Sequence, residues 1–455
     1  MELNSRNKSL VTTIVFASHM FASAFGFCQS PNLLEKAVSY SAPKHIHELR
    51  ELILAKNYPR LGRLLKEELG KTITLEEVEQ LAQKYKANGL LRAIQATRVL
   101  GRDLNEERIR IGLTRGEFFQ MALFIERGLE SPIQKKQYYL PKSETGFSSS
   151  IEYDPLTKKT FILLDGYKNA YIGEGAFKVV TKSLLYTTDH IEVVARGEEL
   201  TPKLRELEIT KLLVGASGVF DIVACTRHTV GSKKYTSIYS RIYSPGALRT
   251  AFDEKYKFSL YEKERIALSL LNGLSELHKR KIVHRDLSSR NYLINIPKGK
   301  PGRRNIKAAV ADLGRAMYAK DAAFTKVQGN TTFTPPEGIF KDKMRGSKYY
   351  AADVYALGCV LYQLFYDEDP KWKNSEYVKN TKVPEKIRYK ELVEGIDRYT
   401  KSRRNELEHK KVSGHISAKE EFEYLILRMV NPDPKKRGSM LQLSQEMQRI
   451  VNRGQ

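Results

Sequence analysis

The chain has 455 residues, of which 41% are hydrophobic, and it carries a formal net charge of +24. This length exceeds one ordinary core and predicts two or three globular domains, which excludes a disordered or fibrous chain. The basic character allows contact with an acidic protein segment or an anionic membrane surface, but no aromatic-interleaved basic motif is present, so nucleic acid is not an expected partner. Cys28, Cys225 and Cys359 have neither metal-ligand spacing nor the even count of a disulfide framework.

Residues 1–30 have the pattern of a signal peptide. Arg6 and Lys8 precede an uncharged run from Leu10 to Phe27, in which Ala22-Ser-Ala24 supplies a small-residue cleavage site. The pattern predicts an exported or secreted protein. An uncleaved membrane anchor and a buried helix are the alternatives, and a protein without a signal is expected to be cytoplasmic.

Residues 44–131 alternate helical periods with stop signals and are expected to form a small all-α domain. Thr74 and Thr114 each open a Thr-x-x-Glu capping box, and the Asn88-Gly89 pair is expected to end the helix that Thr74 begins. Nothing in this segment indicates catalysis, so it is expected to bind a regulatory partner. The aperiodic residues 132–150 are expected to be a linker.

Strand-forming runs begin at residue 151. Ile151 to Tyr153 and Thr160 to Leu164 flank a turn and predict a hairpin. The sequence Tyr171-Ile-Gly-Glu-Gly-Ala-Phe-Lys178 follows. Its glycines would let backbone amides close over phosphates, and Phe177 can fold over the tip of such a loop.

The most informative stretch is His284-Arg-Asp-Leu-Ser-Ser-Arg-Asn291, which Asp312-Leu-Gly314 follows after a basic insertion. Phosphoryl transfer needs a carboxylate that accepts the hydroxyl proton, and further oxygen ligands that hold Mg²⁺ on the phosphates. The order and spacing resemble the catalytic and metal-binding loops of eukaryotic-type protein kinases. The resemblance implies ATP and Mg²⁺ as cofactors, Asp286 as the base, and Asn291 and Asp312 as metal ligands. Arg290 matches the arginine of the tyrosine-kinase catalytic loop.

The resemblance also implies a lysine that grips the α- and β-phosphates, and here the chain departs from the common pattern. Lys178 replaces the third glycine of the family's Gly-x-Gly-x-x-Gly loop. Where the family has Val-Ala-Ile-Lys, the chain has Val194-Ala-Arg-Gly197, with Gly197 or Arg196 in the lysine's place. This combination resembles the with-no-lysine kinases. Lys178 is therefore expected to grip the phosphates, with Arg196 as the rival, and Glu206 of a helix at 202–214 is expected to pair with the lysine. The residues assigned to nucleotide binding are Gly173, Gly175, Phe177, Lys178, Ala195 and Arg196.

Later landmarks extend the resemblance to about residue 451. Asp353 matches the aspartate that braces the catalytic-loop backbone, and Arg437 matches the arginine that pairs with Glu337 of Pro-Pro-Glu. The activation segment is expected at 312–337. Its candidate phosphorylation sites are Tyr318, Thr325, Thr331 and Thr332. Ser288 and Asn330 leave the choice between serine/threonine and tyrosine open.

The expected fold is α+β, a bilobal protein kinase fold preceded by a small all-α domain. The kinase domain is expected at 151–455, with a β-rich small lobe at 151–243 and a helical large lobe at 244–455. The implied function is transfer of the γ-phosphate of ATP to a protein hydroxyl on Ser/Thr, Tyr or both. The missing strand lysine leaves a pseudokinase, a nucleotide-binding scaffold, as the alternative. Because a kinase needs ATP, a secreted kinase is expected in a compartment that contains ATP, for example as an effector in a host cell.

Overall fold

The structure is a computed structural model, and it describes residues 44–130, 137–139, 150–154, 157–167, 169–174, 178–200, 204–230, 233–322, 331–339, 348–372 and 374–453. The expected signal peptide at 1–30 and most of the expected linker at 132–150 lie outside these residues. Gly175, Phe177 and Thr325 lie outside them as well. Among the described residues no helix combines the length and the apolar character that crossing a membrane requires.

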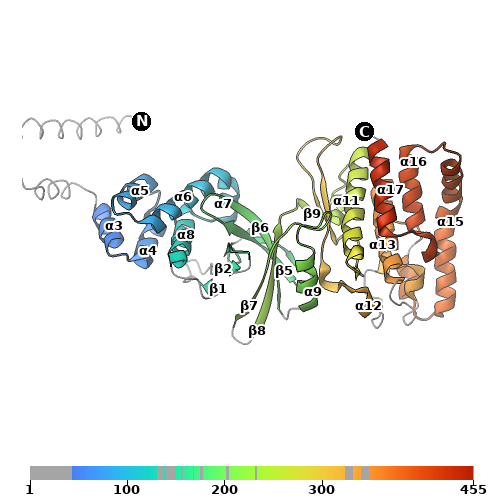
Figure 1. Ribbon diagram of the computed structural model, residues 1–455, viewed down its shortest axis with the longest axis horizontal. Helices are drawn as coiled ribbons and strands as arrows, with labels where there is room; N and C mark the ends of the chain where they lie inside the picture. Colours follow the sequence, from blue (N-terminus) through green and yellow to red (C-terminus); the bar gives the residue numbers. More distant parts are fainter. Residues whose placement is uncertain are drawn as a thin grey trace, which may run out of the picture. The chain divides into compact units, whose positions relative to one another are not determined.

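The chain divides into two compact units, and the described part of the first is built of helices, drawn in blue and cyan in Figure 1. Its helices are α3 (Lys44–Leu54), α4 (Tyr58–Glu68), α5 (Leu75–Lys84), α6 (Asn88–Asp103) and α8 (Arg115–Glu130). Both predicted capping boxes are confirmed. The Thr74 hydroxyl accepts from the Glu77 amide at 3.2 Å, and the Thr114 hydroxyl accepts from the Glu117 amide at 3.1 Å. The role predicted for Asn88-Gly89 was wrong, because α5 ends at Lys84 and Asn88 begins α6.

A short helix within the expected helical domain, α7 (Asn105–Ile111), belongs to the second unit. Glu107 on α7 forms an ion pair with Lys182, with 2.9 Å between Oε1 and Nζ. The Asn169 amide also donates to the carbonyl of Arg110 at 2.5 Å. The division between the two units is therefore not a single cut near residue 131, since the chain enters the second unit and returns.

The small lobe of the second unit is an antiparallel sheet of eight strands in the order β1-β2-β3-β5-β6-β8-β7, with β4 paired to β5. The strands are β1 (Gln137–Tyr139), β2 (Ser150–Asp154), β3 (Lys159–Leu163), β4 (Tyr171–Glu174), β5 (Lys178–Tyr186), β6 (Ile191–Leu200), β7 (Ile222–Val230) and β8 (Lys233–Arg241). The hairpin predicted at 151–164 is confirmed as the pair β2 and β3.

Helix α9 (Leu204–Leu212) packs beside β7 and lies next to the sheet in Figure 1. Leu207 and Leu213 are buried, as expected for the face of this helix that meets the lobe. Leu212 lies off that face, and its side chain is 50% exposed. Glu208 is also exposed, whereas Glu206 is buried.

The large lobe is mostly helical, and its helices are drawn in yellow to red in Figure 1. Its helices are α10 (Leu248–Asp253), α11 (Leu260–Lys279), α12 (Ala319–Ala322), α13 (Lys348–Tyr366), α14 (Asn374–Lys379), α15 (Glu385–Val412), α16 (Ala418–Met429) and α17 (Met440–Arg453), with the 3₁₀ turns η1 (Leu313–Arg315), η2 (Thr331–Phe333), η3 (Pro336–Ile339) and η4 (Pro434–Lys436). Its strands are β9 (Pro245–Ala247), β10 (Ile282–Val283), β11 (Tyr292–Asn295), β12 (Lys307–Val310) and β13 (Met317–Tyr318).

The core of this lobe surrounds α13, which is buried along most of its length. At Gly358 the helix comes so close to α16 that a Cβ atom would lie 2.8 Å from Cβ of Met429, so a larger residue would force the two helices apart. A β-rich lobe followed by a helical lobe, and preceded by a helical region, is the predicted fold class.

Candidate active site

Two small antiparallel pairs hold the loop 284–291. Strand β10 pairs with β13 before the loop, and β11 pairs with β12 after it. Asp353 on α13 braces the loop from the large lobe, as predicted. Its carboxylate accepts the backbone amides of His284 at 2.7 Å and Arg285 at 2.9 Å. These bonds hold Arg285 at a φ of 69°, a left-handed conformation that a non-glycine residue rarely adopts without support.

His284 connects this loop to the second one. Its side chain is fully buried, and Nε2 lies 2.9 Å from the carbonyl oxygen of Ala311, the residue that precedes Asp312. Asp312 itself has a φ of 55°, and its carboxylate accepts the amide of Gly314 at 3.3 Å. The loops that carry Asp286 and Asp312 are thus fixed to each other through buried contacts.

Asp286 and Asn291 are joined within the catalytic loop. The Asn291 side-chain nitrogen donates to the backbone carbonyl of Asp286 at 2.6 Å. Because the nitrogen serves as the donor, the amide oxygen remains to act as a metal ligand. The Asp286 carboxylate lies 3.3 Å from Nε of Arg315, a contact that was not predicted from the sequence. Arg290 is exposed next to Asn291.

The small lobe contributes a lysine to the same site. Lys178, the first residue of β5, forms an ion pair with Glu206 of α9, and its Nζ lies 3.8 Å from the Asp312 carboxylate. Burial acts against the charged form of this lysine, but the carboxylates of Glu206 and Asp312 outweigh burial and raise the pKa of Lys178. The lysine therefore carries a full positive charge beside Asp312.

Neighbouring side chains on β6 point to opposite faces of the sheet. Their direction therefore distinguishes the two alignments, which put either Arg196 or Gly197 at the position of the family's lysine. Residues 196 and 197 are consecutive in a strand, so their side chains leave opposite faces of the sheet. Gly197 lines a small cavity together with Lys178 and Glu206. Ala195, two residues away, shares the Gly197 face. Gly197 thus occupies the position that a strand lysine would take, and Lys178 reaches the same cavity from β5.

Arg196 is engaged on the other face. Its side chain is 2% exposed, and Nη1 lies 2.8 Å from Asp165 while Nε donates to Ser237 at 3.1 Å. Glu198 pairs with it as well, and Glu152 lies 4.0 Å away. Burial acts to lower the pKa of Arg196, but the surrounding acidic groups outweigh burial and raise the pKa. The guanidinium therefore stays charged. The structure does not bring Arg196 to Glu206 or Asp312.

The predicted site residues therefore fall into three groups. The structure brings together Lys178, Glu206 and Asp312, and it joins Asp286 to Asn291. Arg196 lies apart from them. Gly173 lies on β4 at the start of the glycine-rich loop, where it pairs with Val180 of β5.

A buried ion pair anchors the end of the activation segment, as predicted. Arg437 is fully buried, and its two terminal nitrogens lie 2.5 and 2.9 Å from the two carboxylate oxygens of Glu337. The guanidinium also donates to the carbonyls of Asn431 at 2.7 Å and Ala351 at 3.0 Å. This two-bond geometry fixes the segment that ends at Glu337 to the base of the large lobe.

Comparison with known proteins gives a family match over most of the second unit. The model of the protein kinase domain matches residues 168–447. A nodulation receptor kinase of Pisum sativum is 26% identical over 249 residues, which cover 51% of this chain and 25% of the relative. Dual specificity protein kinase splA of Dictyostelium discoideum is 29% identical over 220 residues, which cover 44% of this chain and 9% of the relative. The chain spans a quarter or less of these relatives.

Proposed function

Because the chain belongs to the protein kinase family, we propose that it transfers the γ-phosphate of ATP, bound with Mg²⁺, to a hydroxyl group of a protein. The observation that carries this proposal is the meeting of Lys178, Glu206 and Asp312 beside a catalytic loop that Asp353 braces. These contacts support the proposal, because they join the Lys178 cation to the carboxylates of Glu206 and Asp312 and they fix the loop that carries Asp286.

Asp286 is the group that accepts the proton in this proposal. Its loop is fixed by the Asp353 bonds and by the Asn291 bond to its carbonyl, so the carboxylate is held in place before a substrate binds. Positioning of this kind supplies much of the rate of phosphoryl transfer, because little covalent chemistry is left to the protein.

The metal donors are the amide oxygen of Asn291 and the carboxylate of Asp312. Both are hard oxygen ligands of the type that Mg²⁺ prefers, and the Asp312 side chain is 53% exposed, so an ion can reach it. When bound, Mg²⁺ neutralises charge on the phosphates. The buried His284 contact to the carbonyl of Ala311 sets where the Asp312 carboxylate lies.

Lys178 is assigned to the phosphates, and Glu206 holds it in position. Arg196 is a poor rival, because its guanidinium is committed to Asp165, Glu198 and Ser237 on the opposite face of β6. The pseudokinase alternative rested on the missing strand lysine. Lys178 supplies a cation in the cavity beside Gly197, so the reason for that alternative is removed.

The test is Mg²⁺-dependent transfer of labelled γ-phosphate to the protein itself and to generic protein acceptors. Asp286→Ala and Asp312→Ala should abolish transfer, whereas Asp253→Ala, which removes an exposed carboxylate of α10, should not. Phosphoamino-acid analysis of the product identifies serine, threonine or tyrosine as the acceptor. A folded wild-type protein that binds ATP but transfers no phosphate to any acceptor would contradict the proposal.

A further inference from the structure

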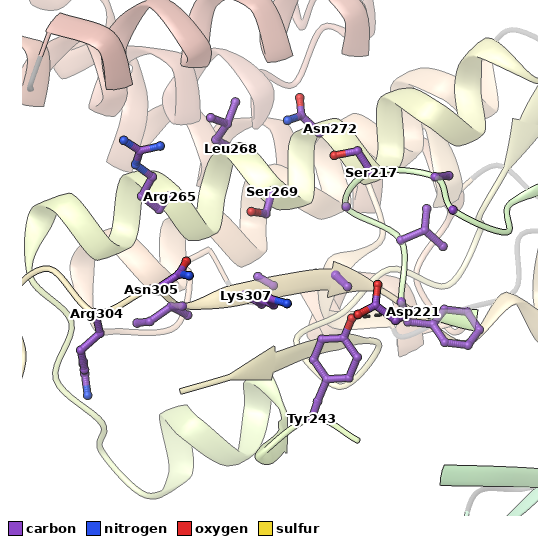
Figure 2. Close-up of a pocket in the computed structure, with 18 of the residues that line it drawn as sticks. Ser217, Asp221, Tyr243, Arg265, Leu268, Ser269, Asn272, Arg304, Asn305 and Lys307 are labelled. Carbon is purple, nitrogen blue, oxygen red and sulfur yellow. Dashed lines mark hydrogen bonds between the residues drawn. The ribbon is translucent and has the colours of Figure 1, made fainter. Parts of the chain in front are cut away.

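A cavity of about 590 Å³ lies in the second unit, away from the residues assigned to catalysis. It is bounded by α11, by the loop 215–221 that follows α9, and by the segment 303–309 that leads into β12 (Figure 2). Neither Asp286, Lys178 nor Asp312 lines it. Its volume falls within the range of cavities that bind ligands, roughly 300–1,000 Å³.

One wall of this cavity is held rigidly by a buried carboxylate. Glu262 on α11 accepts the backbone amides of Gly302 at 3.1 Å and Arg304 at 3.2 Å, and it accepts Nε of Arg304 at 2.7 Å. Burial alone would raise the pKa of Glu262, but the Arg304 guanidinium and the backbone amides lower it to about 2. The end of the basic insertion, 297–304, is thus fixed onto α11 rather than extended into solvent.

The cavity is strongly cationic at the end near this wall. The guanidiniums of Arg265 and Arg303 both lie over the ring of Tyr261, at 5.1 and 5.4 Å from its centroid. Among the described residues, no carboxylate forms an ion pair with Arg265, Arg303 or Lys307, and the charge of Glu264 acts on Arg265 only at longer range. Nε of Arg265 is also buried without a hydrogen-bond partner. Two like charges that share one ring and have no carboxylate at ion-pair distance are stabilised when an anion binds beside them.

The opposite end differs in charge. Asp221 and Tyr243 lie there, where the Asp221 amide donates to the Tyr243 hydroxyl at 3.2 Å, and Figure 2 shows both far from Arg265. Leu268 also lines the cavity, but its side chain is 7% exposed and packs in the core of the large lobe. The lining part of α11, from Tyr261 to Asn272, is about 16 Å long at 1.5 Å per residue, which matches about five residues of extended chain.

We propose that this cavity binds a short extended segment of a partner protein, with acidic side chains at the Tyr261 end. A lone phosphate would use only the cationic end and leave the Asp221 end unoccupied. A nucleic acid, charged at every phosphate, would be repelled by Asp221. A peptide that runs from acidic to basic residues complements the charges at both ends of the cavity. This binding does not depend on phosphoryl transfer.

The experiment measures binding to the full chain, without ATP, by fluorescence anisotropy. The probe is a fluorescein-labelled peptide Glu-Glu-Glu-Leu-Ser-Lys, made in both chain directions, and the competitors are inorganic phosphate and a single-stranded oligonucleotide. The variants are Arg265→Gln and Arg303→Gln, separately and together. The matched control is Lys298→Gln with Lys300→Gln, which removes two charges from the same insertion without touching the cavity lining.

We expect the peptide to bind, with roughly tenfold weaker affinity for each guanidinium removed and unchanged affinity in the control. Replacing the glutamates of the peptide by glutamine should weaken its binding to the wild-type protein by a similar factor. The proposal is overturned if neither peptide direction binds, if the control variant loses affinity as much as the Arg265→Gln/Arg303→Gln variant, or if the glutamine peptide binds equally well. It is also overturned if phosphate or the oligonucleotide binds this cavity more tightly than the peptide. Equal unfolding temperatures of all variants verify that folding does not cause the loss.

Discussion

Removing Lys178 and then restoring a lysine on strand β6 tests its assignment most sharply. Lys178→Met removes the cation that pairs with Glu206, which is only 4% exposed. Loss of one charged group positioned at the reacting phosphates costs about 10²–10³ in rate, or about 3–4 kcal/mol. The buried carboxylate also loses its partner. Because the lysine is 21% exposed, we expect the free energy of unfolding to fall by about 3 kcal/mol, at the low end for buried pairs.

Adding Gly197→Lys to Lys178→Met should recover at least about tenfold of the lost rate. A Cβ atom on Gly197 would meet only the carbonyl oxygen of Ile238, at 3.9 Å, and this residue lines the same cavity as Glu206. Val193→Lys in the same background is the matched control, since it lies on the same face of β6 but about 13 Å along the strand.

The assay is γ-phosphate transfer at saturating ATP, with the unfolding temperature of each variant measured in parallel. Two results would contradict the assignment of Lys178 to the phosphates. One is full activity of Lys178→Met. The other is rescue by Val193→Lys to the same extent as by Gly197→Lys, because a lysine at that distance cannot replace the one paired with Glu206.

Three further outcomes concern buried charges. Arg196→Met should lower the free energy of unfolding by about 3–5 kcal/mol and leave the KM for ATP of the folded protein unchanged, and a large rise in KM would instead favour Arg196 as the phosphate ligand. Arg437→Met should lower the free energy of unfolding by a similar amount, because Glu337 is left without its partner. An unchanged midpoint of denaturant unfolding would show that this pair does not stabilise the lobe. Glu262 has a pKa of about 2 in place of 4.5. Its contribution to the free energy of unfolding, about 3 kcal/mol, is therefore complete above pH 4.5 and is lost as pH falls toward 2. The stability gap between wild type and Glu262→Gln should therefore narrow on acidification, and a constant gap would contradict the Arg304 contact.

The contacts that the sequence predicted correctly belong to motifs with fixed internal spacing. Thr74 caps α5, Asp353 braces the catalytic loop, and Arg437 pairs with Glu337. The first depends on a four-residue pattern, and the other two depend on matching ordered landmarks along the large lobe. The fold class follows from the same landmarks.

What the sequence could not decide depends on strand register and on contacts between distant residues. Arg196 and Gly197 differ by one position, and only the direction of side chains on β6 shows that Gly197 faces Lys178. The attachment of α7 to the sheet depends on Glu107 and Lys182, which lie 75 residues apart. The attachment of the basic insertion to α11 also escapes the sequence, because nothing near residue 304 reveals that Glu262 holds it.

We propose that this chain is an active kinase with Asp286 as its base. The most direct measurement compares wild type with Asp286→Ala for ATP affinity and for single-turnover transfer of the γ-phosphate. Our account predicts equal ATP affinity and a loss of about 10²–10⁴ in the transfer rate, the share that a positioned base supplies. Equal transfer rates in the two proteins would contradict it.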